Sequence, residues 1–551
     1  MKLFAPWRQP ELLLAESLPG KMAENPQGAD APEVHRLRKT VATIASLLIL
    51  AIPSFWLIVT VPPLWRDSDA YVQTVFPPNA ATILAHAPLY CMLSRVPLWL
   101  GYLTSGAGPV VSLDHFIKHT QLTDSGVFAL ILVQHAALWW SALYFINAIT
   151  ANLQSRLLLA IFFASHPLFY AFAHCIGSET LSMIITVFLA AAGLRIVSRY
   201  PNIVLRDWIL FGALLCAAIL TRHINSVLAA LLPIAIFLIA LAQSLHESFA
   251  CRQAISTVTF TFGKSVRVWY ASVVTGLSAL ILATSFTHLL CWHAHIHWRS
   301  KFGFTFVWRL NFVDRVPLGS RDQFLAAPAS KCQLPETRQL LVKVGEQLKQ
   351  NQPWEPTAFV RESRGSFFAP TGKIQDERFD RSLNEMAYAF LCPPSPALWA
   401  AVLQDFQYAS RLRESDVVHY LFKTTHYLFD RRASMPQCAR LKTFREPRAQ
   451  LAGAANQFYF RWWNPISFRL WSIIYLLLLL MALFMNTRFQ ANNGRVILYA
   501  FVLCIFGITM VLLNCFFAAI QPRFTLPMME FLILSIMILL GVILRGVQNV
   551  R

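Results

Sequence analysis

The stretch Val41–Gln73, VATIASLLILAIPSFWLIVTVPPLWRDSDAYVQ, passes from a long apolar run to two carboxylates within a few residues. Its first part, Val41–Leu64, is uncharged and long enough to cross the hydrocarbon of a bilayer, which takes about 20 helical residues. Asp67 and Asp69 follow directly. A charged side chain is costly inside a membrane, so the two acids mark the place where the chain leaves it.

The rest of the chain repeats this apolar pattern. Of its 551 residues, 56% are hydrophobic and 14% are charged, and the apolar residues come in long blocks. This composition predicts an all-α polytopic membrane protein, a helical bundle of about ten spans. The predicted spans are Val41–Leu64, Gly126–Ile149, Leu157–Ala173, Thr180–Val197, Trp208–Thr221, Ile224–Gln243, Ala271–Trp292, Phe468–Met485, Val496–Ile520 and Pro527–Leu544.

Basic residues beside the spans predict the orientation of the bundle. With the N-terminus in the cytoplasm, the inner side collects most of them, as the positive-inside rule requires. The inner set is Arg36, Arg38, Lys39, Arg156, Arg195, Arg199, Arg206, Arg252, Lys264, Arg267, Arg488, Arg495, Arg545 and Arg551. Both termini are then inside, residues 1–40 form a cytoplasmic tail without a cleaved signal peptide, and the acidic loop faces outward.

The spans divide the chain into two membrane parts and a polar insertion. Residues 41–292 form an N-terminal membrane module with an acidic first outer loop at 65–125, and residues 466–551 form the C-terminal membrane helices. Between them, residues 293–465 are rich in charge and proline and predict an inserted, outward-facing soluble domain. This domain has 24 Lys and Arg against 15 Asp and Glu, an excess that suits anionic lipid headgroups or an anionic substrate.

The predicted outer domain contains no Asn-x-Ser/Thr acceptor, which favours a bacterial inner membrane with the active site facing the periplasm. Cys332, Cys392 and Cys438 allow one disulfide in such a compartment, with the pairing open. The chain has no Walker-type loop, which argues against a nucleotide-driven pump, and nucleic acid is not an expected partner.

Histidines near the end of the seventh span raise the question of a metal. The run HLLCWHAHIHW offers side chains that either bind a metal or lie at the membrane interface among tryptophans, the commoner arrangement. Asp-x-Asp holds metal in soluble sugar transferases, where the metal binds a nucleotide diphosphate that is absent on this side. No obligatory metal or other cofactor is expected. The four histidines are His288, His293, His295 and His297.

Ionisable residues recur at the predicted outer ends of the spans. Arg222 and His223 lie in the turn LTRHIN, Arg523 lies in the turn QPRFTLP, and Glu179 opens the fourth span in the stretch GSETLS. Arginines at such places either snorkel to the headgroups or serve a site, and Glu179 either caps its helix or lines a site. Together with the acidic loop they predict a polar pocket at one leaflet.

Several short motifs occur in an order that resembles the GT-C membrane glycosyltransferases. They are the acid-bearing first outer loop, HAPLY at 86–90, SET at 178–180, LTRH at 220–223 and PRFTLP at 522–527. The order is most similar to the branch that contains protein O-mannosyltransferases and lipid A aminoarabinose transferases. That branch carries an Asp-Glu pair in its first outer loop, whereas this chain has Asp-Ser-Asp, so its second acid corresponds to Asp69 and the role of Asp67 is open.

The resemblance implies an inverting glycosyltransferase of the cell envelope that uses a polyprenyl-phosphate sugar. Asp69 would take the proton of the acceptor hydroxyl, and Arg222, His223 and Arg523 would bind the departing phosphate. The cavity would be lined by His86, Tyr90 and Glu179. The acceptor, whether lipid, glycan or protein, stays open.

Two other functions fit the same composition. A secondary transporter or lipid flippase would place ionisable residues near the bilayer midplane on interrupted, symmetry-related helices, whereas here they gather at span ends on one side. An O-antigen ligase or polymerase would also use polyprenyl-linked donors at the outer leaflet. A structured acidic first loop under surface helices would distinguish the glycosyltransferase from these enzymes.

Overall fold

The computed structural model describes residues 31–61, 63–65, 87–106, 108–119, 122–250, 255–295, 298, 300, 302–349, 354–372, 375–421, 466–489 and 493–548. Almost all of this part is helical, and its one sheet pairs β1 (Leu64–Trp65) with β2 (Cys175–Ile176). The acidic segment 66–86, with Asp67, Asp69 and His86, lies outside the described residues.

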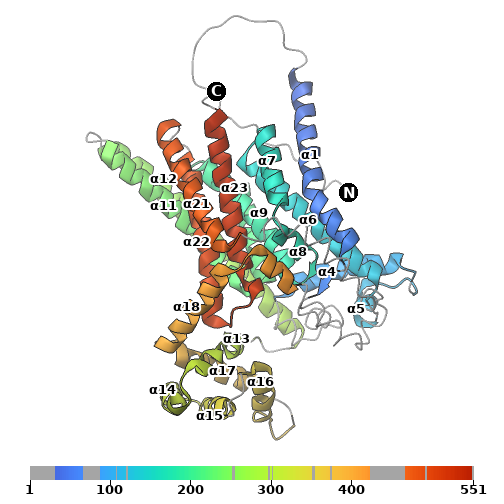
Figure 1. Cartoon of the computed structure of the whole chain (residues 1–551), viewed down its shortest axis with the longest axis vertical. Coiled ribbons are helices and arrows are strands. Elements are labelled where there is room, and N and C mark those ends of the chain that lie inside the picture. The colour runs from blue at the N-terminus through green and yellow to red at the C-terminus, as the bar shows by residue number, and fades with distance from the viewer. Residues whose placement is uncertain are drawn as a thin grey trace, which may run out of the picture.

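Eight helices in the described part of the chain are long and apolar enough to cross a membrane. They run side by side as one bundle (Figure 1), so the protein is an all-α, multi-pass membrane protein. These helices are α1 (Ala31–Thr60), α6 (Asp124–Ile149), α9 (Ser178–Arg199), η1 with α11 (His223–Ala230 and Leu231–Ala250), α12 (Ile255–His293), α21 (Phe468–Phe489), α22 (Asn493–Phe517), and η5 with α23 (Pro522–Thr525 and Leu526–Gln548).

The sequence predicted about ten spans, which is more than the eight helices described above. The difference has two local causes. The predicted span Leu157–Ala173 is divided into α7 (Leu153–Ala164) and α8 (Pro167–Ala173), which meet at an angle of 66°. Pro167 cannot donate a backbone hydrogen bond, so it begins the second helix and ends the first. The predicted span Trp208–Thr221 lies in α10 (Leu205–Thr221), whose 17 residues fall short of a full crossing.

The bundle is apolar on its outside as well as in its centre. On α12 and α21, large aliphatic side chains such as Ile281 and Leu480 are each 64% exposed, whereas α23 is buried along nearly all its length. A water-soluble bundle would bury such faces, so the exposed apolar surface of α12 and α21 fits contact with lipid.

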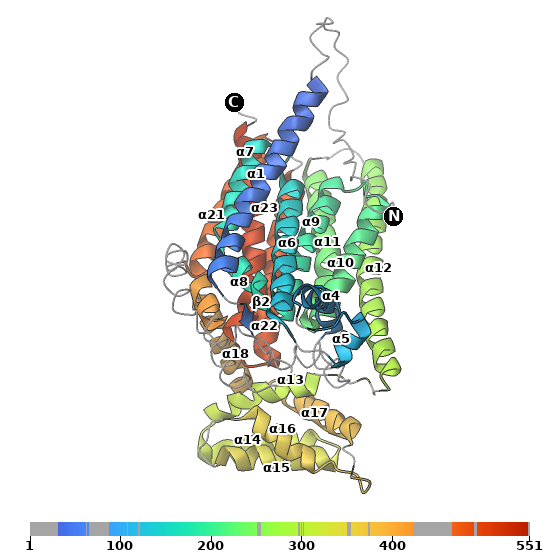
Figure 2. The same cartoon turned by 90° about the vertical axis from the view of Figure 1, so that its right-hand side faces the viewer.

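Short helices gather at one end of the bundle. Two of them, α4 (Pro88–Thr104) and α5 (Leu113–His119), follow the acidic segment. The others lie beneath the bundle in Figure 2 and are called the end cluster here. It consists of α13 (Phe302–Arg309), η2 (Leu310–Arg315), η3 (Leu318–Ser320), α14 (Arg321–Lys331), α15 (Pro335–Lys349), α16 (Pro356–Gly365), α17 (Asp376–Leu391) and α18 (Pro396–Arg411).

The end cluster is joined to the bundle by aromatic contacts and by a buried hydrogen bond. The ring of Phe302 lies 5.5 Å from that of Phe517, at the end of α22, and Trp399 of α18 packs edge-on against Phe516. Beyond α18, Glu414 accepts a 2.6 Å hydrogen bond from His166, and both side chains are fully buried. Since His166 lies at the break between α7 and α8, this pair fixes the cluster to the bundle.

Candidate functional site

The acidic segment begins beside the start of α9. Leu64 and Trp65, the last described residues before it, pair in parallel with Cys175 and Ile176. Behind this pairing, His174 bonds Val61 O through Nε2 at 2.9 Å. The chain therefore enters the segment that carries Asp67 and Asp69 at a place three residues from Glu179.

The acidic segment also ends beside the start of α9. Tyr90, in the first turn of α4, accepts a 3.0 Å hydrogen bond from the backbone N–H of Gly177 and donates one to Gln134 Oε1. Gln134, on α6, in turn donates to the carbonyls of Ala173 and Cys175. Tyr90 is buried and holds the turn in front of Glu179.

Two histidines that were not predicted extend this support into the bundle. The carbonyl of Val61 can only accept, so His174 donates to it from Nε2, and its Nδ1 is 3.2 Å from His135 Nε2. His135 Nδ1 is hydrogen-bonded to Ser54 Oγ at 2.8 Å. Together these hydrogen bonds tie α1 to α6 and to the turn before Glu179.

Glu179 is the point where the predicted ionisable residues meet. It lies in the first turn of α9, where the helix dipole favours a carboxylate, and a Cβ at Gly177 would lie 3.0 Å from its Oε2. Glu179 Oε1 is 3.2 Å from Arg523 Nη1 and 3.9 Å from Arg222 Nη2. The side chains of Glu179, Arg222 and Arg523 are 7%, 15% and 13% exposed, so the three charges are mostly shielded from water.

Each arginine is presented by a short irregular segment. Arg222 follows the last residue of α10, and Asn225 fixes this turn by donating to Ser182 of α9 and to Ala218 O, both at 2.8 Å. Arg523 lies in η5, where its guanidinium is 4.9 Å from the ring of Phe524. Gln521, just before η5, accepts from Tyr420, so the segment that follows the end cluster also reaches this turn.

The two arginines that contact Glu179 are suited to bind an anion. Within the described residues, two guanidiniums lie beside one carboxylate in a poorly hydrated place. Guanidinium binds phosphate or carboxylate oxygens through paired hydrogen bonds. His223, which follows Arg222, has an exposed side chain at the start of η1.

The structure brings some of the predicted residues together. Glu179, Arg222 and Arg523 are brought into contact, and Tyr90 is one hydrogen bond from Gly177. Gln134, His135, His174 and Asn225 were missed, and the signal that marks them is a polar side chain within an apolar run. Asp67, Asp69 and His86 belong to the segment outside the described residues.

The predicted metal and disulfide residues are partly described. His288 stacks on Trp298 with ring centroids 4.5 Å apart. No group of three or more His, Cys, Asp or Glu suited to a metal occurs within the described residues, which leave out His297 and the acidic segment. Cys332 is a buried free thiol and Cys392 an exposed one, while Cys438 lies outside the described part.

Comparison with known proteins does not assign the chain to a family. The chain matches no protein-family model, and no curated protein matches it.

Proposed function

We propose that this protein is an inverting glycosyltransferase that moves a sugar from a polyprenyl-phosphate donor to an acceptor hydroxyl at the outer face of the membrane. The observation that carries the proposal is the meeting of Arg222 and Arg523 at Glu179. These residues come from three distant parts of the chain, and the acidic segment is attached beside them at both of its ends.

The phosphate of the donor would bind the two guanidiniums. Phosphate departs readily at neutral pH, so the site needs positive charge at the leaving oxygen rather than a second acid of the kind that a glycosidase uses. Glu179 would hold Arg222 and Arg523 at one place before the donor arrives. His223 would extend the same positive surface.

Asp69 would be the general base. It follows Trp65 by four residues, a distance that covers at most about 14 Å when the chain is fully extended. Since Trp65 pairs with Ile176, a carboxylate at position 69 can reach a sugar whose phosphate is bound near Glu179. Removal of the acceptor proton by a single base, with the phosphate leaving from the opposite face, inverts the anomeric carbon.

Transfer in isolated membranes tests the proposal. Radiolabelled polyprenyl-phosphate mannose, glucose and galactose are each supplied to membranes that hold matched amounts of wild type, Asp69→Asn or Asp67→Asn. We predict that Asp69→Asn lowers turnover by about 10²–10⁴-fold, the usual contribution of general-base catalysis. Asp67→Asn should lower turnover less.

Asp114→Asn is the matched control, because Asp114 is an exposed acid of the same predicted outer loop, and its ion pair among the described residues is the local one with Lys118. It should keep wild-type turnover. Full activity in Asp69→Asn would remove the assignment of the base. Absence of transfer from all three donors by the wild-type protein would count against the proposed reaction itself.

A further inference from the structure

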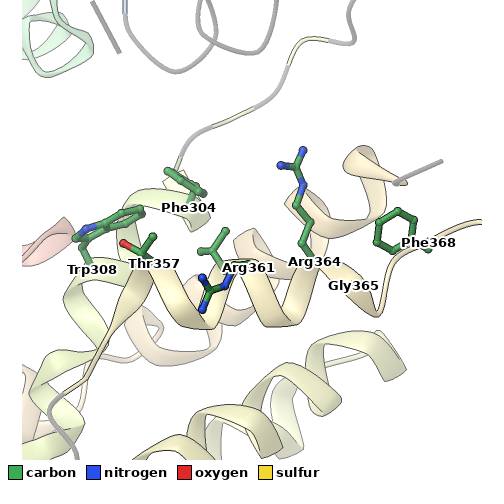
Figure 3. A pocket seen from close by; sticks show the side chains of 8 residues that line it. Phe304, Trp308, Thr357, Arg361, Arg364, Gly365 and Phe368 are labelled. Atoms are coloured by element: carbon green, nitrogen blue, oxygen red, sulfur yellow. The ribbon is translucent and has the colours of Figure 1, made fainter. Parts of the chain in front are cut away.

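A pocket in the end cluster is separate from the site at Glu179. It has a volume of about 350 Å³ and lies between α13 and α16. Figure 3 shows the side chains of Phe304 and Trp308 on one wall and those of Thr357, Arg361 and Arg364 on the other. The volume is in the range of small-molecule sites and suits a ligand of one or two rings.

The walls of the pocket are held in place by a neighbouring tryptophan. Trp354, just before α16, donates from its indole N–H to Val307 O at 2.8 Å and packs on Phe359 with ring centroids 5.0 Å apart. Its backbone N–H donates to Asp314. The start of α16 is therefore fixed against α13, and the pocket is a formed feature of the cluster.

The charge of the pocket is positive. No acidic residue is among those that line it, whereas two arginines are. Arg364 pairs with Asp376 through Nη2 at 2.7 Å, and Arg361 makes no ion pair within the described residues and is exposed. The surface thus offers one unopposed guanidinium, which binds a carboxylate or phosphate group.

The aromatic residues indicate the kind of ligand. The rings of Phe304 and Trp308 have centroids 4.8 Å apart and are inclined by 58°. Their apolar faces can contact the C–H groups of a sugar ring. Phe368, which is 56% exposed, is a further aromatic residue of the pocket lining.

We propose that this pocket binds an anionic saccharide, with a sugar ring on Phe304 and Trp308 and its acidic group on Arg361. The site lies on helices other than those that carry Glu179, Arg222 and Arg523. It is therefore a second binding site of the protein, whose occupancy does not require the transfer reaction.

Calorimetric titration of the full-length protein in detergent with digalacturonate tests the proposal. Saturable binding is expected, weakened about tenfold or more by Arg361→Gln and by Trp308→Ala. Arg361 is exposed, so its replacement leaves the fold intact, and thermal unfolding checks this for both variants. Arg381→Gln is the matched control, because Arg381 is an exposed arginine of the same cluster that pairs with Glu377 on its own helix.

Titrations with maltose, inorganic phosphate and adenosine monophosphate test separately whether the ligand needs an acidic group and whether it needs to be a saccharide. Maltose should bind at least about tenfold more weakly than digalacturonate, because it lacks the carboxylates. Equal binding of phosphate or the nucleotide would overturn the saccharide assignment. An absence of saturable digalacturonate binding, or equal losses in Arg361→Gln and Arg381→Gln, would overturn the site. The titrations contain no polyprenyl-phosphate donor, so their result is independent of the transfer test. Asp69→Asn should therefore bind digalacturonate like wild type.

Discussion

The carboxylate of Glu179 contacts the guanidiniums of Arg222 and Arg523, and all three side chains are mostly buried. Removing one charge of such a group leaves the others poorly compensated, so their energies depend on one another. We expect Glu179→Gln and Arg523→Gln to be non-additive, with a coupling free energy of about 0.5–3 kcal/mol in a double-mutant cycle. Unfolding of the purified protein by detergent titration measures it.

The pair Asp114–Lys118 provides the control for this cycle. Its atoms are 2.8 Å apart, but the side chains are 74% and 53% exposed. Solvent screening limits such pairs to about 0.3–0.5 kcal/mol. Strict additivity at Glu179 and Arg523 would mean that the two side chains do not interact in the folded protein.

The two described thiols of the end cluster differ in environment. Burial raises the pKa of Cys332 to about 11, and the nearby Glu385 carboxylate adds to the shift. The reactive thiolate is therefore scarce at Cys332 between pH 7 and 9, and its fraction grows only as the pH approaches 11. In a Cys251→Ser, Cys438→Ser background, we predict rapid maleimide labelling of exposed Cys392 and slow labelling of Cys332.

Mass spectrometry of peptides after timed labelling at pH 7, 8 and 9 reads out both sites. Unfolding in denaturant should make the two rates similar, which serves as the control for intrinsic reactivity. Equal rates in the folded protein would contradict the buried position of Cys332.

At the scale of elements, α4 crosses α6 at two glycines. A Cβ on Gly101 would lie 2.3 Å from the carbonyl oxygen of Ser125, and one on Gly126 would lie 2.7 Å from that of Leu98. Both neighbours are backbone atoms that cannot rotate away, so a methyl group must separate the helices. We expect Gly101→Ala to destabilise the protein by about 1–3 kcal/mol, as overpacking does.

Gly319→Ala is the control for this substitution, because nothing lies within 4 Å of a Cβ at Gly319. Its thermal unfolding should match that of wild type, while that of Gly101→Ala should occur at lower temperature. Since α4 carries Tyr90, Gly101→Ala should also weaken the support in front of Glu179. An unchanged unfolding temperature for Gly101→Ala would show that the two helices are not in close contact.

At the scale of the whole molecule, the proposed function requires the end cluster and Glu179 to face the same, outer side. Contacts such as Trp399–Phe516 place the cluster at the Arg523 end of the bundle. In the same double-Ser background, we predict that a membrane-impermeant maleimide labels Cys392 in cells with a permeabilised outer envelope. It should not label Val547→Cys, which is an exposed position at the other end of α23.

Lysis of the inner membrane is the control and should expose Val547→Cys to the reagent. Labelling of Val547→Cys but not of Cys392 before lysis would reverse the orientation. Equal labelling of both would contradict any arrangement with the cluster and the C-terminus on opposite sides.

Sequence patterns predict some of these features better than others. The long spans follow from apolar length alone, and the basic residues of two otherwise uncharged turns indicated Arg222 and Arg523. The break at Pro167 changed the number of spans, because hydropathy does not register the direction of a helix. Gln134 and Asn225 are marked in the sequence only as polar side chains within apolar runs. Their role as supports could not be predicted, because the partners of a buried amide are brought together only by folding.

Helix α23 has a consequence for how the protein is made. Its apolar stretch is 94% buried, against 22% for α12 and α21, so a helix that is synthesised after the other described helices fills the centre of the bundle. Glu530 on this helix accepts a hydrogen bond from Thr186 of α9, synthesised 344 residues earlier. An acidic side chain facing lipid raises the free energy of membrane insertion. Insertion of α23 is therefore more favourable when α9 is already in the membrane and can cover Glu530. We infer that the earlier helices assemble around a vacancy during translation, and that a chain ending at Thr525 is degraded, which pulse-chase would reveal.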